Sequence, residues 1–202
     1  MSERERKDRE SDDELIAQYQ LGRAGAFDRL LERHQGPLLG YLVRMTGNRE
    51  TAEDLFQETF LRVLRALPRY EGRGRWKAWL YRTAGNLCID HFRRSGRRPS
   101  VPLDGHPDGE GRLSDVLADG SPAPDRVAGE ARFLAALESA MAGLPEKQRE
   151  VYLLRTVSGL SFREIAEALD CPLGTALGRM HDALARLRAE LGEEWLHELL
   201  DE

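Results

Sequence analysis

The chain has 202 residues, enough for one or two domains that each bury a core of their own. Its formal net charge is −5, and it has no apolar run of about 18 residues, so membrane insertion is not expected. The charged first ten residues lack the hydrophobic segment of a secretory signal. Two distant cysteines outside any CxxC pair are typical of reduced thiols in a cytoplasmic protein, not of a disulfide or zinc framework.

The N-terminal half shows helical patterns only. Ser11 and Glu14 form a capping-box pattern, which predicts a helix over about residues 12–21. After a second apolar segment, Thr51 is predicted to begin a helix whose apolar residues recur at i, i+3 and i+4. A further helix is predicted over about residues 76–95, where a glycine follows as C-cap.

The segment from Arg69 to Arg98 is basic, although the whole chain is acidic. It contains nine Lys/Arg against two Asp/Glu, a local net charge of +7 that leaves −12 on the remainder. Aromatic residues stand among these cations: Tyr70, Trp76 and Trp79 are examples. Spacing predicts that Trp76, Trp79 and Leu80 lie in a helical core. Aromatic faces beside cations are also what unstacked single-stranded nucleic acid requires of its binder.

Residues 99–125 are predicted to be a linker, because prolines and glycines are concentrated there and the net charge is −5. A solvated spacer would have the same composition.

The C-terminal half is also predicted to be helical. A helix over about residues 123–142 precedes the segment "LPEKQREVYLLRTVSGLS". Ser161 and Glu164 then form a second capping box before "FREIAEAL", the break "DCPLG" and the helix "TALGRMHDALARLRAEL". A short and a long helix joined in this way fit a helix-turn-helix, although many such hairpins are only structural. The predicted fold class is therefore all-α, with two small helical domains joined by a flexible linker and no sheet.

Four motifs in order resemble the extracytoplasmic-function sigma factors, a branch of the RNA polymerase sigma family. They are "DELIAQYQLGRAGAFDRLLERH", "AEDLFQETFLRVLRAL", "YEGRGRWKAWLYRTAGNLCIDHFRR" and "LPEKQREVYLLRTVSGLSFREIAEALDCPLGTALGR". The resemblance implies two DNA-reading domains, sigma region 2 for the melted minus-ten element and sigma region 4 for the minus-thirty-five duplex. The implied division is a disordered tail at 1–10, region 2 at 11–98, the linker at 99–125, region 4 at 126–192 and an acidic tail at 193–202.

The resemblance also implies roles for individual residues in the first domain. Asp54, Gln57 and Glu58 correspond to the face that docks on the coiled coil of the polymerase clamp, and an acidic face suits a basic helix pair. Tyr70, the loop after it and Asn86 correspond to the pocket for a flipped base of the melted non-template strand; an amide can both donate and accept hydrogen bonds. The implied phosphate-binding cations are Arg73, Arg75, Lys77, Arg82, Arg93, Arg94, Arg97 and Arg98.

The last helix departs from the family pattern. Leu177, Gly178 and Asp182 stand where relatives tend to carry a cation, a serine and another cation. Arg179 is therefore expected to be the main cation, and the second domain alone is expected to bind duplex DNA weakly. The implied minus-thirty-five contacts are Thr175, Leu177, Gly178, Arg179 and His181.

The expected partners are core RNA polymerase, promoter DNA in duplex and melted form, and an anti-sigma factor, as in most relatives. A net-acidic DNA reader is expected to depend on such a polymerase to reach DNA. No cofactor, metal or catalytic activity is expected.

The alternatives are a free-standing helix-turn-helix regulator, a sigma-like regulator that has lost promoter reading, and a metal-dependent nuclease. The nuclease would use Glu53, Asp54, Glu58 and His91, but no ligand spacing of a known metal motif accompanies them.

Overall fold

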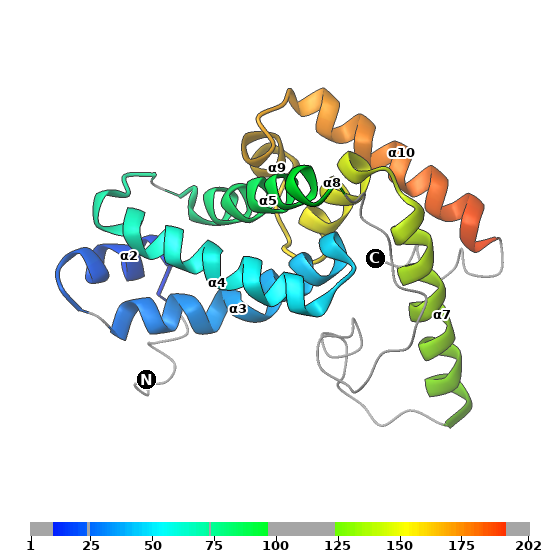
Figure 1. The fold of residues 1–202 in the computed structure, drawn as a ribbon, viewed down its shortest axis with the longest axis horizontal. Coiled ribbons are helices and arrows are strands. Elements are labelled where there is room, and N and C mark those ends of the chain that lie inside the picture. The colour runs from blue at the N-terminus through cyan, green and yellow to red at the C-terminus, as the bar shows by residue number, and fades with distance from the viewer. Residues whose placement is uncertain (1–9, 24, 73, 97–123, 193–202) are drawn as a thin grey trace.

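The computed structural model describes residues 10–23, 25–72, 74–96 and 124–192, with side chains in the last range from Arg132 onward. Every regular element in these ranges is a helix, as the sequence predicts. Figure 1 shows two groups of helices, α2 to α5 and α7 to α10. No helix among the described residues is both long and apolar enough to cross a membrane.

Four α-helices and a short 3₁₀ turn form the N-terminal group. The predicted capping box is confirmed: Glu14 N–H donates to Ser11 Oγ at 3.3 Å, and Ser11 N–H donates to Glu14 Oε2 at 2.7 Å. The predicted C-cap is confirmed as well, because Gly96 adopts the left-handed conformation at φ 61°. The elements are α2 (Asp12–Gln20), α3 (Gly25–Thr46), α4 (Arg49–Ala66), η1 (Leu67–Arg69) and α5 (Trp76–Ser95).

One predicted boundary in this group is wrong. Helix α4 begins at Arg49, not at Thr51, because Asn48 is the N-cap and its side chain accepts from the Thr51 N–H at 2.7 Å. Thr51 is thus the third residue of the helix, and the apolar periodicity marks the buried stripe without marking the cap.

The C-terminal group consists of α7 (Pro124–Gly143), α8 (Glu146–Thr156), α9 (Phe162–Ala168) and α10 (Leu173–Leu191). Helix α7 begins at Pro124, within one residue of the predicted start, at a position that proline's fixed φ suits. Residues 99–123 of the predicted linker lie outside the described residues. The capping box of Ser161 and Glu164 is confirmed at the start of α9. Between α9 and α10, Asp170 takes a left-handed φ of 48° and reverses the chain in a helix-turn-helix.

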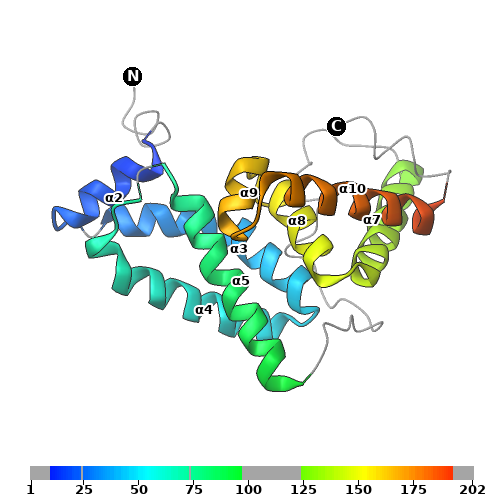
Figure 2. The same cartoon turned by 90° about the horizontal axis from the view of Figure 1, so that it is seen from above.

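The two groups pack against each other. Helix α5 lies on α9 and α3 lies on α8, and the buried apolar residues of both groups form one continuous cluster. Figure 2 shows α9 beside the first half of α5. We call the packing of α3 and α5 on α8 and α9 the domain interface.

Candidate polymerase and nucleic-acid interfaces

Helix α4 presents one acidic face to solvent. Its opposite stripe is buried in the core: Ala52, Leu55, Thr59, Phe60 and Val63. Asp54 and Gln57 are exposed and Glu58 is partly exposed, so the three residues implied in polymerase docking do share one outward face. Glu58 pairs with Arg62 at 2.8 Å within the helix, an i,i+4 contact worth about 0.3–0.5 kcal/mol.

Sequence reasoning missed an apolar member of this face. Leu61 follows Gln57 by four residues and Glu58 by three, and its side chain is 47% exposed. A leucine on the buried stripe of α4 would be shielded from solvent. Leu61 is exposed, and its spacing from Gln57 and Glu58 places it on the same outward face as these residues. The signal was available as spacing, because Leu61 stands off the i, i+3, i+4 stripe of the buried residues. The face therefore combines carboxylates with an exposed apolar side chain at its C-terminal end.

An aromatic corner joins α4 to α5. Tyr70 lies 4.9 Å from Trp79 and 6.0 Å from Trp76 between ring centroids. Trp76 and Leu80 are buried, which confirms their predicted core role, whereas Trp79 is only half-buried. Burial of the half-buried Tyr70, with the charge of Asp13 nearby, raises the pKa of its hydroxyl to about 12.

The loop after Tyr70 is held in place by contacts to α2. Gln20 Nε2 donates to the Tyr70 carbonyl at 2.8 Å, and the Gly74 N–H donates to Asp13 Oδ2 at 2.6 Å. The Tyr70 hydroxyl donates to the Gly72 carbonyl at 2.7 Å, so the ring folds back over Gly72. A Cβ at Gly72 would lie 2.5 Å from that hydroxyl, which explains the glycine. Tyr70, Gly72 and Gly74 are therefore held by contacts within the protein itself.

The cations implied in DNA binding do not all lie together. Arg75, Arg82, Asn86 and Arg93 follow one another at spacings of seven, four and seven residues, so they form one exposed line along α5, here called the α5 stripe. Arg94 is exposed beside this line. Arg73, Arg97 and Arg98 lie outside the described residues.

Lys77 is separated from the α5 stripe. It is half-buried and lines a hollow at the domain interface together with residues of α2, α3 and the segment 156–159. The family resemblance grouped Lys77 with the other cations, but the rotation of the helix places it on another side of α5.

Helix α10 exposes an unusually apolar first half. Leu173 and Leu177, one turn apart, are 41% and 45% exposed. Gly178 and His181 are exposed with them, and Thr175 is half-buried. The sequence analysis did not include Leu173 in the exposed face of α10, although Leu173 precedes Leu177 by four residues and so lies on the same side of a helix. A Cβ added at Gly178 would meet no other atom within 4 Å, so packing within the fold does not require this glycine.

Arg179 is less exposed than a side chain that contacts DNA freely would be. It is half-buried, and burial raises the pKa of Glu150 on α8, a rise that the nearby charge of Arg179 partly offsets. Its expected role as the main cation of α10 stays a prediction.

The residues of the nuclease alternative do not gather into a centre. His91 lies on α5 with its ring 5.7 Å from Phe92, whereas Glu53, Asp54 and Glu58 lie on α4. In the part of the chain that the structure describes, no group of three or more His, Cys, Asp or Glu side chains could hold a metal ion. Both cysteines are free, and burial raises the pKa of the Cys88 thiol well above its usual range.

Comparison with known proteins matches both helical groups. The family "Sigma-70 region 2" matches residues 30–98, and "Sigma-70, region 4" matches residues 134–187. The RNA polymerase sigma-H factor of Pseudomonas aeruginosa is 33% identical over 86% of this chain and 90% of its own length. The ECF RNA polymerase sigma factor SigW of Bacillus subtilis is 32% identical over 87% and 94%. A solved structure of CnrH in complex with the cytosolic domain of CnrY is similar at a TM-score of 0.64 and 25% identity, over 90% of this chain and 97% of that one.

Proposed function

Because the chain belongs to the extracytoplasmic-function family of RNA polymerase sigma factors, we propose that each exposed face described above has one role in promoter-specific initiation. The α4 face of Asp54, Gln57 and Glu58 docks on core polymerase. The aromatic corner and the α5 stripe bind the melted minus-ten strand, and α10 reads the minus-thirty-five duplex. The protein acts in the cytoplasm, where the polymerase is, and has no catalytic activity of its own.

The observation that carries this proposal is the separation of an acidic face and a basic face on one small helical domain. Helix α4 offers carboxylates beside Leu61, and α5 offers guanidinium groups beside half-buried aromatic rings. A helix-turn-helix regulator that binds operators by itself requires neither face. Melted DNA does require the second, since stacking on an aromatic ring is worth about 1–3 kcal/mol per base.

The domain boundaries follow from this assignment. Residues 11–98 form the region 2 domain and residues 124–192, from the start of α7, form the region 4 domain, joined by the acidic linker. Control by an anti-sigma factor is part of the proposal, because CnrH is similar in structure over most of this chain and its structure holds the cytosolic domain of CnrY.

Run-off transcription tests the proposal. Core polymerase with this protein, on a library of genomic fragments, is expected to give discrete transcripts that core polymerase alone does not give. A gel shift without polymerase is the matched comparison. Strong, sequence-specific binding of the free protein to duplex DNA, with no transcripts, would contradict the proposal and favour a free-standing regulator.

A second candidate, a sigma-like regulator that has lost promoter reading, is favoured by the apolar start of α10. Leu173 and Leu177 can contact thymine methyl groups but cannot hydrogen-bond a base edge. Arg179→Ala separates the two candidates. If α10 reads DNA, promoter binding is expected to weaken by about 1–3 kcal/mol. A smaller loss, together with no gain from Leu177→Lys, would favour the second candidate.

A further inference from the structure

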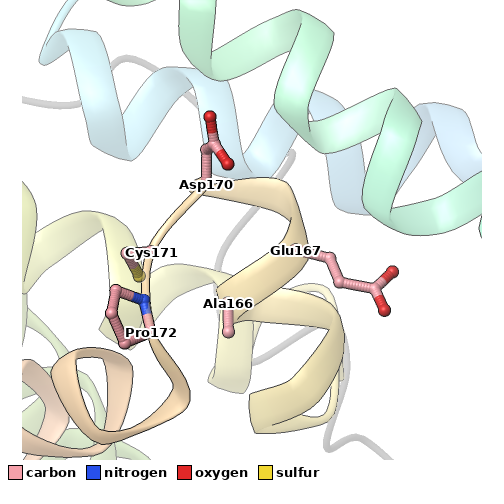
Figure 3. Close-up of a pocket in the computed structure, with 5 residues that line it drawn as sticks. All are labelled: Ala166, Glu167, Asp170, Cys171 and Pro172. Carbon is pink, nitrogen blue, oxygen red and sulfur yellow. The ribbon is translucent and has the colours of Figure 1, made fainter.

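The two carboxylates at the end of the first helix of the helix-turn-helix face the DNA-binding side of α5. Glu167 Oε2 lies 3.7 Å from Arg75 Nε, and Asp170 Oδ2 lies 3.6 Å from Arg82 Nη2. Both arginines belong to the α5 stripe. Figure 3 shows the Asp170 carboxylate pointing from the turn toward the neighbouring helix, while the Glu167 side chain extends from α9 on the side away from Cys171 and Pro172. We call these two ion pairs the closing contact.

The rest of the domain interface brings the two groups of helices close at a second place. Glu150 of α8 is buried, and its Oε1 would lie 2.8 Å from a Cβ built on Gly85 of α5. The Tyr41 hydroxyl of α3 would lie 3.3 Å from the same point. An alanine at position 85 would therefore require the Glu150 side chain to shift. A third ion pair, Arg44 with Glu138 at 3.7 Å, joins α3 to α7.

We propose that the free protein is autoinhibited: Glu167 and Asp170 take the place of DNA phosphates on the α5 stripe and hold the two domains closed. This inference rests on the proposed role of the stripe in binding the minus-ten strand. A carboxylate and a phosphate offer a guanidinium group the same kind of charged oxygen, so the two compete for Arg75 and Arg82. Each group of helices buries apolar residues of its own, so the two domains can separate without either one unfolding.

The closing contact is weak enough to be opened. Arg75 and Glu167 are 70% and 51% exposed, and Asp170 is 86% exposed, so salt screens both pairs. The burial of Glu150 adds a cost to the closed state because an ionised carboxylate loses its hydration there. Core polymerase can reach the α4 face without disturbing the closing contact, since Asp54, Gln57 and Leu61 are exposed in the closed form. Docking on polymerase would therefore come before the domains open.

Small-angle X-ray scattering of the full chain tests closure without any DNA. Glu167→Gln with Asp170→Asn removes both charges at nearly unchanged shape, and asparagine tolerates the left-handed backbone at position 170. The radius of gyration at low salt is expected to rise in this double variant and to stay unchanged in Glu190→Ala, an exposed acidic control on α10. Glu167→Arg should open the protein, and adding Arg75→Glu should close it again. An unchanged radius in every variant would overturn the proposal.

A second arm measures binding of a fluorescent single-stranded oligodeoxynucleotide of mixed sequence to the free protein. Glu167→Gln with Asp170→Asn is expected to raise its affinity about threefold to tenfold, because a larger fraction of molecules is open. A larger radius with unchanged affinity would overturn the inhibitory role of the closing contact. If neither the closed nor the opened protein binds the oligonucleotide, the proposed minus-ten role of the α5 stripe fails, and the inhibition proposed here fails with it.

Discussion

The acidic face of α4 and the α5 stripe lie on the same small domain, yet the closed structure treats them differently. The α4 face is open: Asp54 and Gln57 are exposed and lie away from the domain interface. Two arginines of the α5 stripe are instead engaged by carboxylates of the second domain. A protein that must meet a polymerase before it meets DNA is expected to expose the first surface and protect the second.

This difference also accounts for the distribution of charge. A free basic stripe would bind any nucleic acid, because phosphate neutralisation supplies most non-specific affinity. Acidic residues on α9 and its turn reduce that affinity within the same chain. The net charge of −5 acts in the same direction.

The largest effect is expected on the open face. Replacing Asp54, Gln57 and Glu58 by alanine together should weaken binding to core polymerase by about 100-fold, or about 2.8 kcal/mol. The melting temperature should stay close to that of the unchanged protein, because none of the three side chains packs in the core. Binding can be measured by fluorescence anisotropy of the labelled protein.

Two controls sharpen this prediction. Glu32→Ala removes an exposed carboxylate on α3 and should leave polymerase binding unchanged. Leu55→Ala, from the buried stripe of α4, should instead cost about 2–5 kcal/mol of stability. A triple variant that loses stability but keeps its polymerase affinity would refute the docking role of the α4 face.

A smaller effect is expected at the aromatic corner. Tyr70→Ala and Asn86→Ala should each reduce promoter opening by about tenfold, within the range of one lost base contact. Tyr70→Phe keeps the ring against Trp79 and should retain most of the opening rate. Opening can be followed by permanganate footprinting. If Asn86→Ala is equally defective on a pre-melted bubble of any sequence, Asn86 does not read a base.

Much of each domain could be predicted from local sequence. The two capping boxes, the glycine at position 96 and the apolar stripe of α4 depend on residues within a few positions of one another, and all are found in the structure. The start of α4 was missed because Asn48 and Thr51 are both acceptable caps, and only the backbone shows which one accepts the hydrogen bond.

The domain interface could not be predicted in this way. Glu150 and Gly85 are 65 positions apart, and in the sequence Glu150 resembles any exposed glutamate of a charged helix. Its burial depends on how the two domains meet, which no local pattern specifies. The same holds for Lys77, which the family resemblance assigned to the DNA side and which the fold places at the domain interface.

The closed state should depend on pH through Glu150. Burial raises the pKa of this carboxyl to about 7 from an ordinary value of 4.5. The cost of keeping it buried is absent below pH 4.5, grows as pH rises to about 7 and is constant above that, so closure should weaken over this window. The groups around it are Glu146 and Lys147 of α8, Arg179 of α10, Tyr41 of α3 and Cys88 of α5.

Glu150→Gln is the matched variant, because an amide has nearly the same shape and does not titrate in this range. The radius of gyration of the unchanged protein should rise between pH 5 and about 7.5, whereas that of the variant should stay flat and small. Equal pH profiles for both proteins would show that another group controls the domain interface.

The smallest effect concerns Gly178 on α10. Because a Cβ there meets no neighbouring atom, Gly178→Ala should stabilise the helix by up to about 1 kcal/mol through its higher propensity. Thermal melting measures this gain, and Gly174→Ala, at a second open position one turn earlier, is the control. If promoter binding is unchanged in Gly178→Ala, the glycine is only tolerated. A stabler protein that binds duplex DNA less well would show that α10 uses the bare backbone at Gly178 to approach the DNA closely, and would place this glycine among the residues that read the minus-thirty-five element.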